Sequence, residues 1–61
     1  MRYEILKTEI EDSKRLIKVK DLVADQLIIY YEGEVQYIPD PELLLFLKAR
    51  MYWIRSGVYD S

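Results

Sequence analysis

Few side chains in this sequence could carry out chemistry. The chain has no histidine, no cysteine and only two glycines. These absences exclude catalytic triads, redox dithiols, ordinary structural zinc sites and glycine-rich phosphate loops. Asp21 and Asp25 could share one face if their segment were helical, and with water molecules they could hold Mg²⁺. Solvated acids in turns explain the same spacing, so we predict no enzyme, no cofactor and no metal site.

Basic and aromatic side chains offer a second kind of chemistry. Lys14, Lys18 and Lys20 share one face of a candidate strand, and Arg15 is adjacent. Tyrosines follow on the neighbouring segment, and such a surface can stack on bases while its cations follow a nucleic-acid backbone. Lysine on a strand also guards against edge-to-edge pairing, and the net charge of -2 is unlike that of a nucleic-acid binder. Nucleic-acid binding is therefore the alternative hypothesis rather than the main one.

The two prolines, Pro39 and Pro41, divide the chain into two unlike parts. After them the composition is that of a helix, in which Asp40 is a good N-cap and Pro41 fits the first helical position. Gly57 is a suitable stop signal. These features predict a helix over about residues 41–55.

The part before the prolines is rich in β-branched and aromatic residues, which predicts strands joined by short turns. The expected strands are residues 2–11, 15–20, 26–32 and 34–38. Glu32-Gly33 indicates a tight hairpin between the last two. Residues 13–24 could be strand and loop or a capped helix, and the alternation of lysine with apolar residues favours the strand. The sequence therefore predicts one α+β domain over residues 1–61, an antiparallel β-meander of three to four strands with one C-terminal helix across a face.

The predicted helix carries apolar residues on two of its sides. The first stripe, typical of a helix face that covers a sheet, consists of Leu43, Leu44, Leu47, Met51 and Ile54. A second set, also at spacings of three and four, consists of Leu45, Phe46, Ala49 and Trp53. A curled sheet could take the second set into the monomer's core, or the set could form an exposed interface. We predict the interface, because aromatic anchors on a rigid helix are typical of interface centres.

Together these features predict a small non-enzymatic protein-interaction protein. A chain of 61 residues buries only a small core, and without disulfides or zinc the formation of oligomers is one route to stability. A homodimer is the first expectation and a larger protein partner is the second. The charged N-terminus and the short apolar runs predict a cytoplasmic protein with no membrane segment. The small size and lack of catalytic groups are also typical of accessory proteins of viruses and mobile elements.

Overall fold

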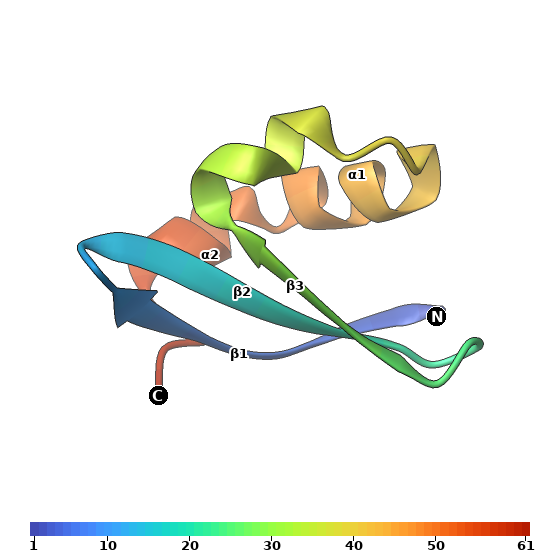
Figure 1. Cartoon of the computed structure of the whole chain (residues 1–61), viewed down its shortest axis with the longest axis horizontal. Coiled ribbons are helices and arrows are strands. Elements are labelled where there is room, and N and C mark those ends of the chain that lie inside the picture. The colour runs from blue at the N-terminus through green and yellow to red at the C-terminus, as the bar shows by residue number, and fades with distance from the viewer.

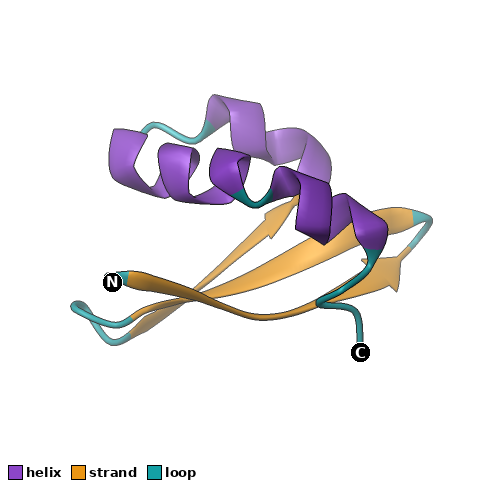
Figure 2. Cartoon of the chain, turned by 180° about the vertical axis from the view of Figure 1, so that it is seen from behind, coloured by secondary structure: helices purple, strands orange, loops and turns teal.

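The computed structural model describes residues 1–61 and has two layers, a β-sheet and a set of helices that covers one face of it (Figures 1 and 2). The sheet is an antiparallel meander in the order β1-β2-β3. The elements are β1 (Tyr3–Glu11), β2 (Lys14–Asp21), β3 (Gln26–Tyr31), the 3₁₀ helix η1 (Glu32–Tyr37), α1 (Pro41–Ala49) and α2 (Met51–Ser56). The predicted α+β meander with a C-terminal helical region is confirmed. None of the helices has the length and hydropathy that crossing a bilayer requires.

Short turns join the three strands. Asp12 and Ser13 both have positive φ values, 52° and 63°, as the two central residues of a tight hairpin turn require. After β2, the Asp21 carboxylate accepts hydrogen bonds from the backbone N–H groups of Val23 and Ala24 at 3.0 and 2.9 Å. This side chain thereby fixes the turn that leads into β3. The ambiguous segment 13–24 is therefore strand and turn, and not a helix.

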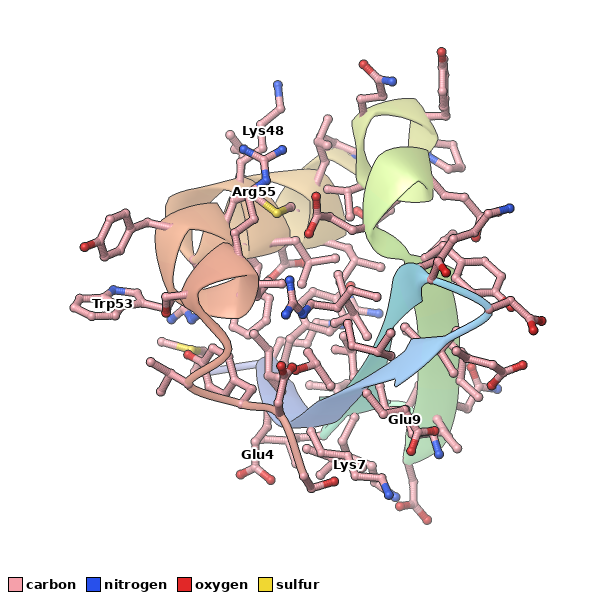
Figure 3. All side chains as sticks on the ribbon, turned by 90° about the vertical axis from the view of Figure 1, so that its left-hand side faces the viewer. Glu4, Lys7, Glu9, Lys48, Trp53 and Arg55 are labelled. Carbon is pink, nitrogen blue, oxygen red and sulfur yellow. The ribbon has the colours of Figure 1, made fainter.

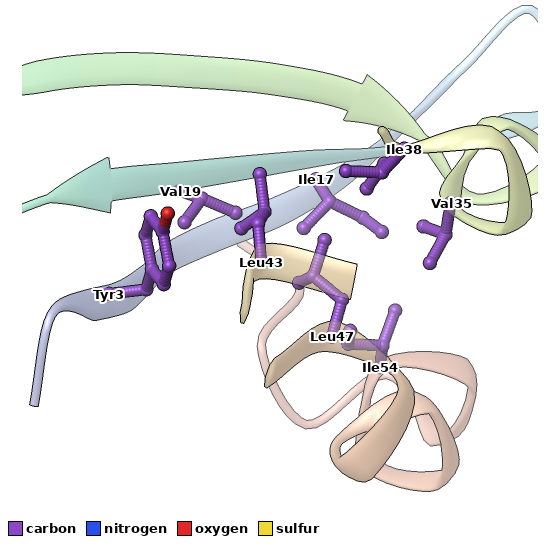
Figure 4. Close-up of a cluster of buried hydrophobic side chains, with 8 residues drawn as sticks. All are labelled: Tyr3, Ile17, Val19, Val35, Ile38, Leu43, Leu47 and Ile54. Carbon is purple, nitrogen blue, oxygen red and sulfur yellow. The ribbon is translucent and has the colours of Figure 1, made fainter. Parts of the chain in front are cut away.

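The hydrophobic core lies between the inner face of the sheet and the helices (Figure 4). It consists of Tyr3, Ile17, Val19, Val35, Ile38, Leu43, Leu47 and Ile54. The start of α1 is tied to this core, because Asp40 caps the helix by accepting from the Glu42 N–H at 3.0 Å and also accepts from the Tyr3 hydroxyl at 3.0 Å. The predicted N-cap therefore also positions the helix against β1.

The predicted fourth strand over residues 34–38 is wrong, and so is the hairpin at Glu32-Gly33. These residues form η1, and Gly33 does not have a positive φ value. The physical reason is the spacing of Val35 and Ile38, which are both buried. Residues three apart lie on the same side of a 3₁₀ helix, whereas a strand would send them to opposite faces. The third strand accordingly ends at Tyr31, one residue earlier than predicted.

The predicted single helix over residues 41–55 is divided at Arg50, which has φ -109° and ψ 5°. Arg50 donates a hydrogen bond from its guanidinium Nη1 to the Phe46 carbonyl oxygen at 3.0 Å. That carbonyl is the one that would accept the Arg50 backbone N–H in a regular α-helix. The N–H instead donates to the Leu47 carbonyl at 3.1 Å. The side chain thus competes with the backbone and tightens the helix at this point.

The C-terminal tail is fastened along the outer edge of β1. The Thr8 N–H donates to the Tyr59 carbonyl at 2.9 Å, and the Ser61 N–H donates to the Thr8 carbonyl at 3.1 Å. The Asp60 carboxylate accepts from the Thr8 hydroxyl and from both Nε and Nη2 of Arg15. Because the Arg15 guanidinium and the Thr8 hydroxyl bind the charged form, the pKa of Asp60 is lowered. The tail therefore closes one edge of the sheet.

Replacing Gly57 with alanine is expected to destabilise the fold by about 1–2 kcal/mol, because φ is 87° there and L-residues pay about that much for the left-handed region. The new Cβ would also lie 3.1 Å from Oδ2 of Asp60, in the tail contact. Gly33→Ala is the matched control, since no atom lies within 4 Å of its added Cβ. Urea denaturation of both variants tests this, and equal stabilities would contradict it.

Candidate functional site

Three of the four residues predicted to form an interface are exposed on the helices. The exposed fractions of Leu45 and Trp53 are 66% and 52%, and Ala49 lies between them in the chain and is also exposed. In Figure 3 the Trp53 side chain projects away from the body of the molecule. α1 and α2 therefore leave large apolar side chains uncovered on the side away from the core.

Phe46, the fourth predicted residue, is half-buried and packs against the core. Its ring lies 5.6 Å from the Tyr3 ring, centroid to centroid, and the Arg50 guanidinium carbon lies 4.0 Å from its centroid on another side. The cation over the aromatic face gains electrostatic attraction and also covers apolar surface. The structure thus separates Phe46 from the other three residues and gives it a role within the fold.

Tyr52 is a further exposed aromatic residue on the helices, beside Trp53. It is 74% exposed, and its ring meets the Trp53 ring edge to face at a centroid distance of 4.9 Å. The sequence pattern had indicated no functional role for Tyr52, although it follows Leu45 by seven residues, a spacing that returns to the same helix face. We call Leu45, Ala49, Tyr52 and Trp53 the helix patch.

A shallow apolar hollow adjoins the helix patch. It has a volume of about 370 Å³, and six of its eight lining residues are hydrophobic. Phe46 and Arg50 line it from the helical side, while Ile5, Leu22 and Tyr59 are among the residues that line it from the sheet and the tail. The chain therefore presents a projecting aromatic pair on α2 and a separate recess that α1 lines through Phe46.

Two cations of the helices, Lys48 and Arg55, lie together on a different side from Trp53 (Figure 3). Arg55 is held there by Glu32, with Nε 3.2 Å from the carboxylate oxygen. Trp53 therefore projects away from these two cations, whereas Arg55 follows Tyr52 by three residues in the same helix.

The four basic residues of the nucleic-acid hypothesis do not form one surface. Ile17 and Val19 point into the core, so the alternation along β2 puts Lys14, Lys18 and Lys20 on the outer face of the sheet. Arg15 instead pairs with Asp60 and Glu32.

Two of the three β2 lysines on the outer face form ion pairs. Lys18 pairs with Glu9 at 3.0 Å, and Lys20 pairs with Asp25 at 2.7 Å. In Figure 3 Lys7 and Glu9 extend from the same outer face, so it carries both signs of charge. These ion pairs lower the pKa values of Glu9 and Asp25 and leave little net positive charge for a phosphate backbone.

The two acids considered for Mg²⁺, Asp21 and Asp25, have separate structural roles. The Asp21 carboxylate is buried and accepts from Nε and Nη2 of Arg2 at 3.0–3.3 Å, besides its two backbone N–H partners. The hydrogen bonds from Arg2 and from the backbone lower its pKa. The Asp25 carboxylate forms an ion pair with Lys20 at 2.7 Å. Within the chain no three acidic residues gather as ligands for a metal ion.

The chain was compared with protein-family models, with curated proteins and with solved structures, and none of these comparisons gives a match.

Proposed function

We propose that this chain is a non-enzymatic protein-interaction domain that binds its partner through the helix patch. The observation that supports this most strongly is the pair Tyr52 and Trp53, which is held edge to face on a helix and left mostly exposed. Tryptophan and tyrosine supply large contact areas at low conformational cost and are enriched among the residues that dominate binding energies. A fixed helix presents them without a further ordering penalty on binding.

A second copy of the chain is the partner that we propose first. The helix patch projects and the hollow beside Phe46 recedes, so two copies related by a two-fold axis could each insert an aromatic side chain beside the other's helices. A two-fold contact uses the same surface on both subunits, which is the commonest arrangement of oligomers. It would also bury apolar surface that a domain of 61 residues cannot bury alone. A larger protein that offers a groove is the other candidate partner.

Trp53→Ala is expected to weaken dimer formation by about thirtyfold or more, because truncating a central aromatic anchor costs about 2 kcal/mol or more of binding energy. Tyr37→Ala is the matched control, since Tyr37 is also a largely exposed aromatic residue but lies on η1, outside the helix patch. Sedimentation equilibrium of the wild type and both variants over a wide concentration range measures the effect.

Circular dichroism accompanies each measurement, so that loss of the fold is not mistaken for loss of the interface. A wild type that stays monomeric at high micromolar concentration contradicts the homodimer. If, in addition, the wild type captures no protein partner, or only partners that Trp53→Ala also captures, the helix patch has no binding role and the proposed function is lost.

A further inference from the structure

The two edge strands of the sheet, β1 and β3, differ in whether another segment covers their outer backbone groups. The edge of β1 is covered at Thr8 by the C-terminal tail, and its ladder is interrupted by an irregularity between Ile5 and Lys7. Both devices are known ways to prevent another strand from pairing with an edge. β3 forms the opposite edge, and it pairs with β2 alone. In Figure 1 β3 runs along the outside of the sheet and no segment lies against it as a fourth strand.

The hydrogen-bond pattern identifies which backbone groups of β3 are free. The Tyr31 N–H donates to Oε1 of Glu34 at 2.9 Å, so Tyr31 directs its N–H away from β2. In an antiparallel ladder alternate residues direct both their N–H and their C=O to the same side. Leu27 and Ile29 therefore also point their backbone groups outward, toward solvent. Glu34 occupies the Tyr31 donor at the end of the strand, which leaves Leu27 and Ile29 as the open positions.

The side chains of β3 give no protection to this edge. None of the six residues from Gln26 to Tyr31 is charged, and none is proline or glycine. Leu27 and Ile29 are 55% and 46% exposed on the outer face of the sheet. An unpaired, uncharged strand rich in β-branched and aromatic residues is a template for pairing with another extended chain.

We propose that the free edge of β3 binds an extended segment of another protein, which adds to the sheet as a fourth strand. Backbone hydrogen bonds to Leu27 and Ile29 would hold this segment in register, and apolar side chains at its alternate positions would pack beside theirs. This surface is separate from the helix patch, because it lies on the sheet and not on α1 or α2.

Charge at the two ends of β3 defines the ends of the partner segment. Asp25 precedes the strand, and Glu32 and Glu34 follow it. Lys20 pairs with Asp25 and Arg55 pairs with Glu32, whereas Glu34 has no cationic partner. A segment with a lysine or arginine beside Glu34 fits this distribution, because opposite charges across neighbouring strands are favourable.

The same charges disfavour a second copy of β3 as the occupant. An antiparallel pair of β3 strands would bring Glu34 of each copy into the neighbourhood of Asp25 of the other, where Lys20 is already paired with Asp25 and leaves no free cation for Glu34. Like charges that face each other across strands are destabilising. A foreign segment with an apolar centre and basic ends meets no such penalty.

Amide hydrogen exchange of the wild-type protein tests the proposal directly. The probe is a short synthetic peptide of alternating valine and threonine with a lysine at each end. Its addition is expected to slow the exchange of the Leu27 and Ile29 amides, by about tenfold when the free peptide is about ten times its Kd. A control peptide with the same side chains and every backbone amide N-methylated has no N–H donor on either edge, so it cannot form the ladder and is expected to leave both amides unchanged.

Two proline variants provide a matched pair in the protein itself. Ile29→Pro removes an outward N–H, which proline can do on an edge strand without breaking the ladder to β2. It is expected to keep the circular dichroism of the wild type and to lose peptide binding, whereas Ile28→Pro removes an N–H directed at β2 and is expected to unfold the sheet. Should Ile29→Pro not fold, Ile29→Lys keeps the backbone and is expected to weaken binding by repelling the basic peptide.

The proposal is overturned if the peptide leaves the Leu27 and Ile29 amides unprotected at all soluble concentrations, or if the N-methylated peptide protects them equally. It is also overturned if raising the concentration of the protein alone slows these two amides, because the occupant is then a second copy. Trp53→Ala is expected to bind the peptide like the wild type. Failure of the helix patch and failure of the β3 edge are therefore distinguished.

Discussion

Replacing Leu47 with alanine is expected to lower the free energy of unfolding by about 2–5 kcal/mol, the range measured for fully buried leucines. Leu47 is 0% exposed and lies in the core between the sheet and α2 (Figure 4). The total stability of a domain this small rarely exceeds about 3–5 kcal/mol. We therefore expect Leu47→Ala to lose most of the wild-type stability, as urea denaturation followed by circular dichroism would reveal.

Leu45→Ala is the control for this prediction, because it is the same substitution two residues earlier in the same helix. Leu45 is exposed in the helix patch, so its truncation removes little buried surface. The unfolding free energy of the monomer is expected to change by less than about 0.5 kcal/mol. If the two variants proved equally stable, the assignment of the core-facing side of α1 would be wrong.

The sequence predicted the first three strands and the start of α1 well, because local chemistry determines them. Alternation of side chains placed β2, and the turn at Asp12-Ser13 needed only residues that tolerate positive φ values. Asp40 and Pro41 marked the helix start, and the structure shows the Asp40 cap hydrogen bond. In each case the determining contacts lie within a few residues of one another.

The segment after β3 was mispredicted because tertiary contacts determine its conformation. Its composition is that of a strand, and Gly33 is compatible with a hairpin. However, the core requires Val35 and Ile38 on one side, and Glu34 takes the Tyr31 N–H that a continuing strand edge would leave free. The core constraint cannot be read from the local pattern, because it depends on where α1 covers the sheet, whereas the contact between Glu34 and Tyr31 is local to η1.

The prediction of the site was limited in the same way. Helical spacing placed Leu45, Ala49 and Trp53 in one set, and the structure leaves all three exposed. It could not show that Tyr3, which is far away in the sequence, and Arg50 would enclose Phe46. The open edge of β3 was hidden for a different reason, because the strand was expected to pair with a fourth strand that does not form.

Ion pairs between distant segments supplement the small core. Arg2 joins the N-terminus to Asp21 at the end of β2 and to Glu42 in α1, with distances of 3.0 and 3.2 Å. Arg15 joins β2 to Asp60 in the tail at 3.0 Å. Because each carboxylate receives hydrogen bonds in its charged form, the pKa values of Asp21 and Asp60 are both lowered from the ordinary aspartate value. The fold therefore depends on these acids remaining ionised.

Acidification is expected to destabilise the protein, and Asp21→Asn is expected to weaken this dependence on pH. A carboxylate whose pKa is lowered by folding contributes its full stabilisation above its unfolded value of about 3.9, and the contribution is lost as the pH falls through the lower folded value. Stability should thus be nearly constant from pH 7 to about pH 5 and decline below that.

The asparagine side chain in Asp21→Asn would keep the shape of the aspartate but lose the charge that Arg2 faces at 3.0 Å. The variant should therefore be less stable than the wild type at pH 7, and the difference should shrink as the pH falls, because the wild-type Asp21 becomes protonated as well. Asp12→Asn is the control, since Asp12 is exposed in a turn with a φ of 52° that asparagine tolerates. Thermal unfolding of the three proteins across this pH range measures the effect, and parallel pH profiles for the wild type and Asp21→Asn would contradict the role assigned to Asp21.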